Sequence, residues 1–334
     1  MARISLSISF SAELRFRSKE LRGIRYIYEV NRLKQTIAQP QTIDIHNFTD
    51  ASGSYWQSAS ASFAGTHTFA YNSDAVYTPV SGTSVLAAVA DGITMSPPST
   101  YGRGLDSQNQ MVQEQRDRLS RKSNSLIEPA EYKSRCLGAK VANAIMQALN
   151  TAADKLISVD DLRKLLQGPV LRKNFLESSA LPQGAYAGAS TLSVALDEKE
   201  KVRILTLADS PVFYFDKKSQ EIKFIGPEEH SHIVTDSLHI DHVSTNDADT
   251  SSSVLSPFTH DRQIPKSDIG WIMIASDGIL GEARGPQNLI DFLNTDLGDK
   301  VPNVNPQTLA AKALEFAYLN KSHDDISVTV LQAA

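Results

Sequence analysis

Aspartates at the ends of apolar segments are the residues of this chain best suited to chemistry. Asp91 follows the run V-L-A-A-V-A, and Asp277 follows W-I-M-I-A-S. Asp324 stands before the run I-S-V-T-V-L, with one further aspartate between them. A buried strand that stops in this way places a carboxylate at the edge of a sheet. The glycine that follows each of the first two aspartates permits a sharp turn.

Two further aspartates, Asp74 and Asp209, lie in the shorter sequences N-S-D-A and L-A-D-S. Five carboxylates at strand ends could form one oxygen-rich pocket, and oxygen ligands select hard divalent cations such as Mg²⁺ or Mn²⁺. Two such ions about 4 Å apart can share a water molecule, lower its pKa and neutralise a phosphate ester. A single Asp-Gly pair is usually only a turn, but the ordered set favours a metal site.

Composition excludes several other classes of protein. The chain has 334 residues, and an apolar fraction of 41% is ample for a core. A net charge of -5 implies no nucleic-acid partner, and no apolar run reaches the roughly 20 residues of a membrane span. The single cysteine, Cys136, rules out an internal disulfide and fits a reducing compartment. We therefore expect a cytoplasmic monomer, although a protein delivered into another cell would look the same.

The elements that must position the aspartates follow from periodicity. Alternating apolar runs joined by turns predict antiparallel strands at 66–70, 75–80, 85–90, 184–196, 202–208, 212–216, 221–225, 271–275 and 326–331. Helical periodicity predicts helices at 139–149, 159–166, 286–294 and 306–319. The Ser-, Ala- and Gly-rich residues 50–62 predict a loop. This order indicates one α+β domain with helices packed on sheets.

Six short motifs, taken in order, resemble those of the PPM-type metal-dependent protein phosphatases, the protein phosphatase 2C family. They are Asn72-Ser73-Asp74-Ala75, Val89-Ala90-Asp91-Gly92, Gly188-Ala189-Ser190-Thr191, Ala208-Asp209-Ser210, Ala275-Ser276-Asp277-Gly278 and Asp324-Asp325-Ile326-Ser327-Val328. No single motif is specific, but six in order are. The resemblance covers about residues 66–331, and it is to a divergent, bacterial-type member.

The resemblance implies a four-layer α-β-β-α sandwich with two central, mainly antiparallel sheets. Residues 63–334 would form the phosphatase-like catalytic domain, with insertions at about 97–134 and 228–268. Residues 1–62 would be an N-terminal extension or the first strands. The implied activity is hydrolysis of phosphoserine and phosphothreonine in a phosphorylated protein substrate, by a water that Mn²⁺ or Mg²⁺ activates.

The resemblance also assigns roles to single residues. Asp91 would bridge two ions and the Gly92 carbonyl would bind one of them, while Asp277 and Asp324 would hold the other. Asp209 would serve a more labile third ion, and Asp74 would support the site through ordered water. His67, in a G-T-H sequence, could contact phosphate or donate a proton, or could be an ordinary strand histidine.

The pattern departs from the family at several positions. Ser73 stands where the family often has Glu or Gln, and Gly281 stands where an acidic ligand for the third ion often lies. The arginine that often holds the phosphate is missing, and Phe69 lies near its place. These departures leave two alternatives open: a pseudophosphatase that binds partners without catalysis, or a phosphatase of small metabolites.

Histidines in the second insertion offer a competing metal site. Four of them occur close together: His230, His232, His239 and His242. Their spacing could bind zinc, but no cysteine accompanies them and their surroundings are rich in Ser and Asp. The sequence therefore favours a solvated loop.

Overall fold

The structure of the chain is a computed structural model. It describes residues 5–6, 41–63, 72–93, 137–152, 158–167, 189–226, 238–240, 253–255, 258–283, 285–322 and 324–333. All statements below concern these residues. None of the helices among them is both long enough and apolar enough to cross a bilayer.

A six-stranded antiparallel sheet contains the last strand of the described chain. In spatial order its strands are β12 (Glu221–Ile225), β11 (Val212–Asp216), β16 (Ile269–Ala275), β17 (Ile326–Ala333), β4 (Tyr55–Phe63) and β3 (Asp44–Thr49). β17 therefore lies in the interior of the sheet, between β16 and β4. Its residues 327–331 are all buried, because both faces of the strand are covered.

A five-stranded antiparallel sheet packs against the first. In spatial order its strands are β15 (His260–Pro265), β10 (Lys201–Leu207), β9 (Leu192–Glu198), β6 (Val85–Ala90) and β5 (Ala75–Val76). Every residue of β6 is buried. Alternate side chains of β6 join two different cores: Leu86 packs between the sheets, whereas Val85 and Ala88 face helices.

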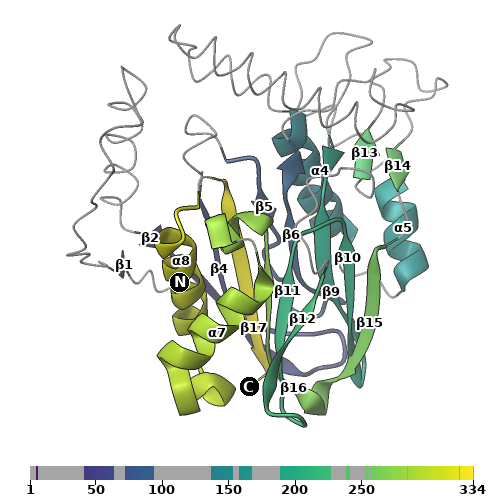
Figure 1. Cartoon of the computed structure of the whole chain (residues 1–334). Helices are drawn as coiled ribbons and strands as arrows, with labels where there is room; N and C mark the ends of the chain where they lie inside the picture. Colours follow the sequence, from purple (N-terminus) through teal and green to yellow (C-terminus); the bar gives the residue numbers. More distant parts are fainter. Residues whose placement is uncertain are drawn as a thin grey trace, which may run out of the picture.

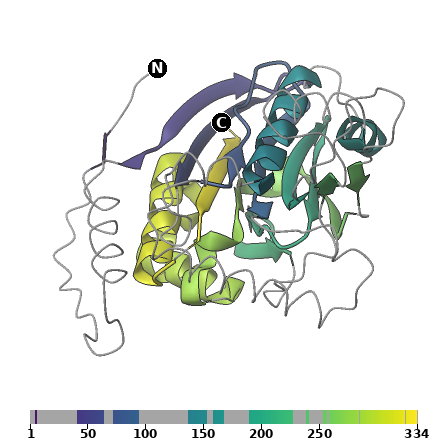
Figure 2. The same cartoon turned by 90° about the horizontal axis from the view of Figure 1, so that it is seen from above.

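Helices cover the outer face of each sheet. On the five-stranded sheet lie α4 (Leu137–Ala152) and α5 (Val159–Gln167), and on the six-stranded sheet lie α7 (Pro286–Leu297) and α8 (Pro306–Leu319). Figures 1 and 2 show the two helix pairs on opposite sides of the strands. The predicted α-β-β-α sandwich with two antiparallel sheets is thus confirmed for the described residues.

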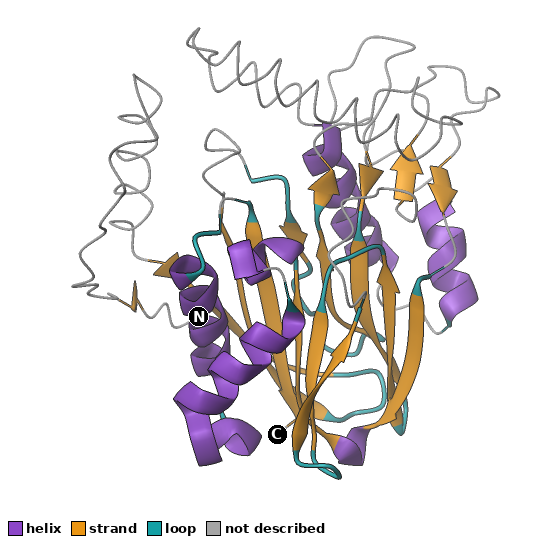
Figure 3. Cartoon of the chain, in the orientation of Figure 1, coloured by secondary structure: helices purple, strands orange, loops and turns teal. Residues whose placement is uncertain are grey.

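Short elements complete the described chain. A small sheet consists of β14 (Ser253–Leu255), β13 (Leu238–Ile240), β8 (Ala189–Ser190) and β7 (Gly92–Ile93), and β1 (Ser5–Leu6) pairs with β2 (Gln41–Thr42). The 3-10 helices are η3 (Lys266–Asp268), η4 (Asp277–Ala283) and η5 (Gly298–Asn303). β13 and β14 lie at the upper end of the molecule in Figures 1 and 3.

The predicted loop at 50–62 is wrong for most of its length, because residues 55–63 form β4. Trp56 packs between the sheets, whereas Ala59 and Ala61 face the helices. Small side chains are needed on that outer face because α8 packs on this strand. The Ser- and Ala-rich composition, which is typical of loops, here allows a helix to pack closely on a strand.

Part of the second predicted insertion also lies within a central sheet. Residues 260–265 form β15, which pairs along its whole length with β10. β15 has only one buried side chain, Ile264, because it is an edge strand. Its polar sequence therefore lacked the apolar alternation that predicts a strand. Of the first predicted strands, 66–70 lies outside the described residues and 75–80 is a strand only at β5.

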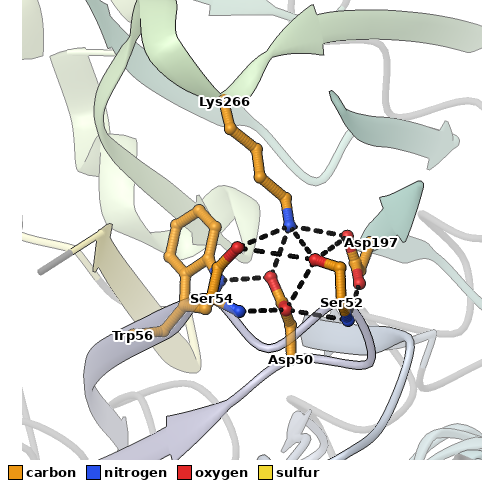
Figure 4. A network of polar contacts seen from close by, with 6 residues as sticks. All are labelled: Asp50, Ser52, Ser54, Trp56, Asp197 and Lys266. Carbon is orange, nitrogen blue, oxygen red and sulfur yellow. Dashed lines mark hydrogen bonds and ion pairs between the residues drawn. The ribbon is translucent and has the colours of Figure 1, made fainter. Parts of the chain in front are cut away.

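A buried polar network joins the two sheets at the ends of the strands far from Asp91. Lys266 Nζ lies 2.5 Å from Asp50 Oδ2, at the β3–β4 turn, and 2.7 Å from Asp197 Oδ1, on β9. The Asp50 side chain also accepts hydrogen bonds from Ser52 and from Trp56 Nε1. Figure 4 shows these groups gathered around the Lys266 ammonium. The network therefore ties an end of the six-stranded sheet to an end of the five-stranded sheet.

Candidate metal centre

The predicted site aspartates come from the same ends of both sheets. Asp91 follows β6, and Asp209 follows β10 in the five-stranded sheet. Asp277 begins η4 just after β16, and Asp324 lies just before β17 in the six-stranded sheet. Asp74 precedes β5. Because β17 runs toward the C-terminus marked at the lower end of Figure 1, this edge of the sheets is at the upper end.

Asp91 lies among other carboxylates. Its pKa is raised well above the ordinary value by desolvation first, and then by the negative charges of Asp74, Asp277, Asp324 and Asp209, in that order. Although Asp91 keeps some accessible surface, desolvation is still the largest influence on its pKa. The structure thus brings the other four predicted aspartates within electrostatic range of Asp91.

Asp74 is the most enclosed of these groups, with 6% of its surface exposed. Burial raises its pKa well above the ordinary value, and the charge of Asp325 is the next largest cause. Neither of its carboxylate oxygens makes a hydrogen bond of good geometry, although the nearby Ser276 and Asp91 side chains act to lower its pKa. A buried carboxylate in this state is costly unless a cation is near.

The backbone of Asp91 is held by Ser190, the last residue of β8, and by Thr191, which follows it. The Asp91 amide donates to Thr191 Oγ1 at 3.1 Å, and its carbonyl accepts from Ser190 Oγ at 2.8 Å and from the Thr191 amide at 2.9 Å. Thr191 Oγ1 also lies 2.5 Å from Ser210 Oγ. The motifs that contain Ser190 and Ser210 therefore position the Asp91 main chain.

Gly278 allows the two acidic turns of the six-stranded sheet to interlock. A Cβ at Gly278 would lie 1.9 Å from the Asp325 carbonyl oxygen, far inside van der Waals contact. Ser322 Oγ donates to the Gly278 carbonyl at 2.6 Å. The glycine after Asp277 is therefore required by the close approach of the Asp324–Asp325 backbone.

Hydroxyl groups extend this interlock to Asp74. The Ser327 amide donates to Ser276 Oγ at 2.8 Å, and Ser327 Oγ lies 2.5 Å from Ser62 Oγ. Asn72 donates to Ser62 and accepts from the Asp74 amide through its own side chain. Short polar side chains thus link β4, β17 and the segment before β5.

Two residues at which the sequence departs from the family have structural explanations. Gly281 has φ +55°, and a Cβ there would lie 2.8 Å from the Asn320 carbonyl oxygen, so this position has no room for an acidic side chain. Ala208, which replaces a glycine before Asp209, adopts φ +70°. That left-handed conformation is strained for alanine, so the replacement is less mild than its size suggests.

The histidine predictions fall largely outside the described residues. His67, His230, His232 and His242 all lie there. His239 belongs to β13. The roles of His67 at phosphate and of the four histidines at zinc stay predictions.

The donor set fits a hard divalent cation in chemistry. Asp74 has unpartnered, buried oxygens, and the strongest charged influences on Asp91 are all carboxylates. As they stand, however, no three or more His, Cys, Asp or Glu side chains of the described residues are arranged to hold a metal ion. Side-chain rotation would therefore have to accompany cation binding.

Comparisons with known proteins give only weak similarities. No family model matches the chain, and no curated protein matches it. One similar solved structure is "PppA, a key regulatory component of T6SS in Pseudomonas aeruginosa", with 16% identity, a TM-score of 0.48, and coverage of 84% of this chain and 99% of that one.

Two other similar structures have bound metals. The catalytic domain of serine threonine protein phosphatase PstP, in complex with two manganese ions, has 16% sequence identity and a TM-score of 0.48. The match covers 84% of this chain and 98% of that one. RsbX in complex with magnesium has 11% sequence identity and a TM-score of 0.46. The match covers 87% of this chain and 100% of that one. The four-layer arrangement of the described elements, rather than these similarities, agrees with the PPM-type fold that the sequence motifs implied.

Proposed function

We propose that the chain is an Mg²⁺- or Mn²⁺-dependent phosphatase that hydrolyses phosphoserine and phosphothreonine in proteins. The observation that supports it best is the gathering of carboxylates from both sheets around Asp91. Such a group is strongly self-repelling without a cation. The order of the six motifs supports the choice of phosphate monoesters as substrates.

In this proposal Asp91 and the Gly92 carbonyl would hold one ion, and Asp91, Asp277 and Asp324 would hold a second. Asp209 would serve a more labile third ion, and Asp74 would support the site. When bound, the cations would neutralise phosphate charge and lower the pKa of a water molecule that attacks phosphorus. The chain itself contributes rigid strand ends, which hold the carboxylates at fixed places.

Hydrolysis of para-nitrophenyl phosphate tests the activity. We expect turnover only with added Mn²⁺ or Mg²⁺, complete loss with EDTA, and recovery when the metal is restored. Asp299→Asn, an exposed aspartate in η5, serves as a matched control for substitutions of site aspartates. Turnover that survives complete chelation would contradict the proposal. A library of phosphopeptides, compared with small phosphorylated metabolites, then tests the substrate class.

One observation favours a different function, that of a pseudophosphatase which binds a protein without catalysis. No group of three ligating side chains among the described residues is arranged to hold an ion as it stands. Calorimetric titration distinguishes the two functions. Micromolar Mn²⁺ binding with turnover supports the phosphatase, whereas an absence of Mn²⁺ binding, or binding without turnover on any phosphopeptide, favours the binding protein.

A further inference from the structure

Ser73 and Asp325 form a buried pair that joins the segment before β5 to the start of β17. The Ser73 amide and hydroxyl both donate to Asp325 Oδ2, at 2.6 and 2.5 Å. The exposed fractions are 3% for Ser73 and 1% for Asp325. Ser73 thus does not face the site as a weak ligand. It is the donor that fixes a neighbouring carboxylate.

The Asp325 carboxylate lies against the residue that precedes Asp74, because its Oδ2 accepts both hydrogen bonds from Ser73. The Asp325 amide also donates to Asp324 Oδ1 at 3.0 Å, so the two adjacent aspartates are locally ordered. Asp325 is therefore part of the carboxylate group, although the sequence did not single it out.

The two hydrogen bonds from Ser73 do not require an acid at position 325. Both donors are neutral, so they stabilise the Asp325 charge without cancelling it. An asparagine would accept the same two hydrogen bonds through its side-chain oxygen, and would not place a negative charge beside Asp74, whose buried carboxylate oxygens make no hydrogen bond of good geometry. A divalent cation bound nearby would make the two buried carboxylates favourable together.

We propose that Asp325 is an additional acidic residue of the divalent-cation site, and that Ser73 is the positioning residue that holds it there. This inference rests on the proposed function, because it assumes that Mn²⁺ or Mg²⁺ binds among these carboxylates. In this proposal the negative charge that position 73 lacks is supplied by Asp325, just before β17.

Isothermal titration with Mn²⁺ on the full chain is the first test. Asp325→Asn keeps an acceptor for Ser73 and removes the charge, so we expect the affinity to fall about tenfold or more. Ser73→Ala removes one of two hydrogen bonds to Oδ2 and should lower affinity several-fold, while Ser73→Thr, which keeps a hydroxyl, should restore most of it. If Ser73 acts through the Asp325 charge, Ser73→Ala should have little effect in the Asp325→Asn background.

Melting of the metal-free protein gives a second readout that does not depend on activity. Asp325→Asn should raise the melting temperature, because it removes repulsion with Asp74 while keeping the Ser73 hydrogen bonds. Ser73→Ala should lower it. A residue with a purely structural role would show an unchanged or lower melting temperature in Asp325→Asn and an unchanged Mn²⁺ affinity, and that pair of results would overturn the inference.

Ser58→Ala is the matched control for Ser73→Ala. Ser58 is fully buried on β4, and its hydroxyl has no hydrogen-bond partner, so Mn²⁺ affinity should stay at the wild-type value. The two proposals fail in different ways. If the wild-type chain binds neither Mn²⁺ nor Mg²⁺, both are wrong. If it binds and Asp325→Asn binds equally well, only the role of Asp325 is wrong.

Discussion

Burial and neighbouring carboxylates destabilise the negative charge of Asp91. Substitution of this residue should therefore affect activity and stability in opposite directions. Asp91→Asn removes a charge from the centre of the carboxylate group, so metal-dependent turnover should fall by roughly 10³-fold or more. In the metal-free protein the same change should raise the melting temperature, because repulsion is relieved. Turnover and melting with and without Mn²⁺ check both signs. Full metal-dependent activity in Asp91→Asn would contradict the two-metal reading.

The raised pKa values of Asp74 and Asp91 also predict a pH dependence for the metal-free protein. In the unfolded chain both groups have a pKa of about 4. Between that pH and their higher folded-state values, the folded chain holds more protons than the unfolded chain. The free energy of unfolding should therefore fall as pH rises through this window. Urea midpoints across the window check this, and Asp91→Asn should show a shallower fall.

Ala208 offers a stability test at a single backbone conformation. Its φ of +70° is unfavourable for any residue with a Cβ, so Ala208→Gly should increase the free energy of unfolding by about 0.5–1 kcal/mol. Ala311→Gly, in the interior of α8, should lower it by about 1 kcal/mol. Urea denaturation measures both. A loss of stability in Ala208→Gly would show that the strain is absent.

At the scale of elements, the strands that could be predicted are those with at least one apolar face. β6 and β16 are near-continuous apolar runs because a sheet covers one face and helices cover the other, whereas β12 and β17 mix apolar with polar residues. β4 and β15 could not be predicted for opposite reasons. β4 needs small side chains beneath α8, and β15 has only one buried side chain because it lies at an edge. Amino-acid composition alone does not reveal the packing of α8 on β4 or the edge position of β15.

The aspartates of the candidate site could be chosen from the sequence for a similar reason. Strand-end aspartates are visible as breaks in apolar runs, so five carboxylates could be chosen. Asp325 could not, because its importance depends on Ser73, a residue 252 positions away in the chain. The Ser190 and Thr191 contacts with the Asp91 backbone were likewise invisible. Pairings between distant segments leave no local pattern.

The Lys266 network is an element-scale tie that can be broken by one substitution. Lys266→Met leaves two buried carboxylates, Asp50 and Asp197, without their shared cation. Breaking a buried ion pair in this way typically costs about 3–5 kcal/mol of unfolding free energy. Lys223→Met, in the exposed pair with Glu221, should change it by less than about 0.5 kcal/mol. Equal effects of the two substitutions would contradict a clamping role.

The same network predicts acid sensitivity. Burial favours a higher pKa for Asp50, but hydrogen bonds from Lys266, Trp56, Ser52 and Ser54 outweigh it and lower the pKa. The stabilisation is therefore complete above the unfolded-state value of about 4 and is lost as pH falls through the lower folded-state value. Asp50→Asn should be less stable than wild type at pH 7, and the difference should shrink toward pH 2. A constant difference would exclude this linkage.

At the scale of the whole molecule, the site depends on both sheets at once. Asp91 and Asp209 come from one sheet, and Asp277 and Asp324 come from the other, so a bound cation would link the two. Binding to the folded state alone adds about 2.7 kcal/mol at a free metal concentration one hundred times Kd. Mn²⁺ should therefore raise the melting temperature of the wild type, and EDTA should reverse it. Asp91→Asn should show a much smaller shift.

The place of β17 between β16 and β4 also has a consequence for how the protein is made. Ser62 on β4 and Ser327 on β17 are in contact although 265 positions separate them. At roughly 5–20 residues per second of synthesis, β4 emerges about 13–53 s before its partner. During that time one side of β4 lacks its neighbour, and an unpaired strand edge readily joins another chain. Slow translation or a shortage of chaperones should therefore reduce the yield of folded protein, although neither changes the free energy of unfolding.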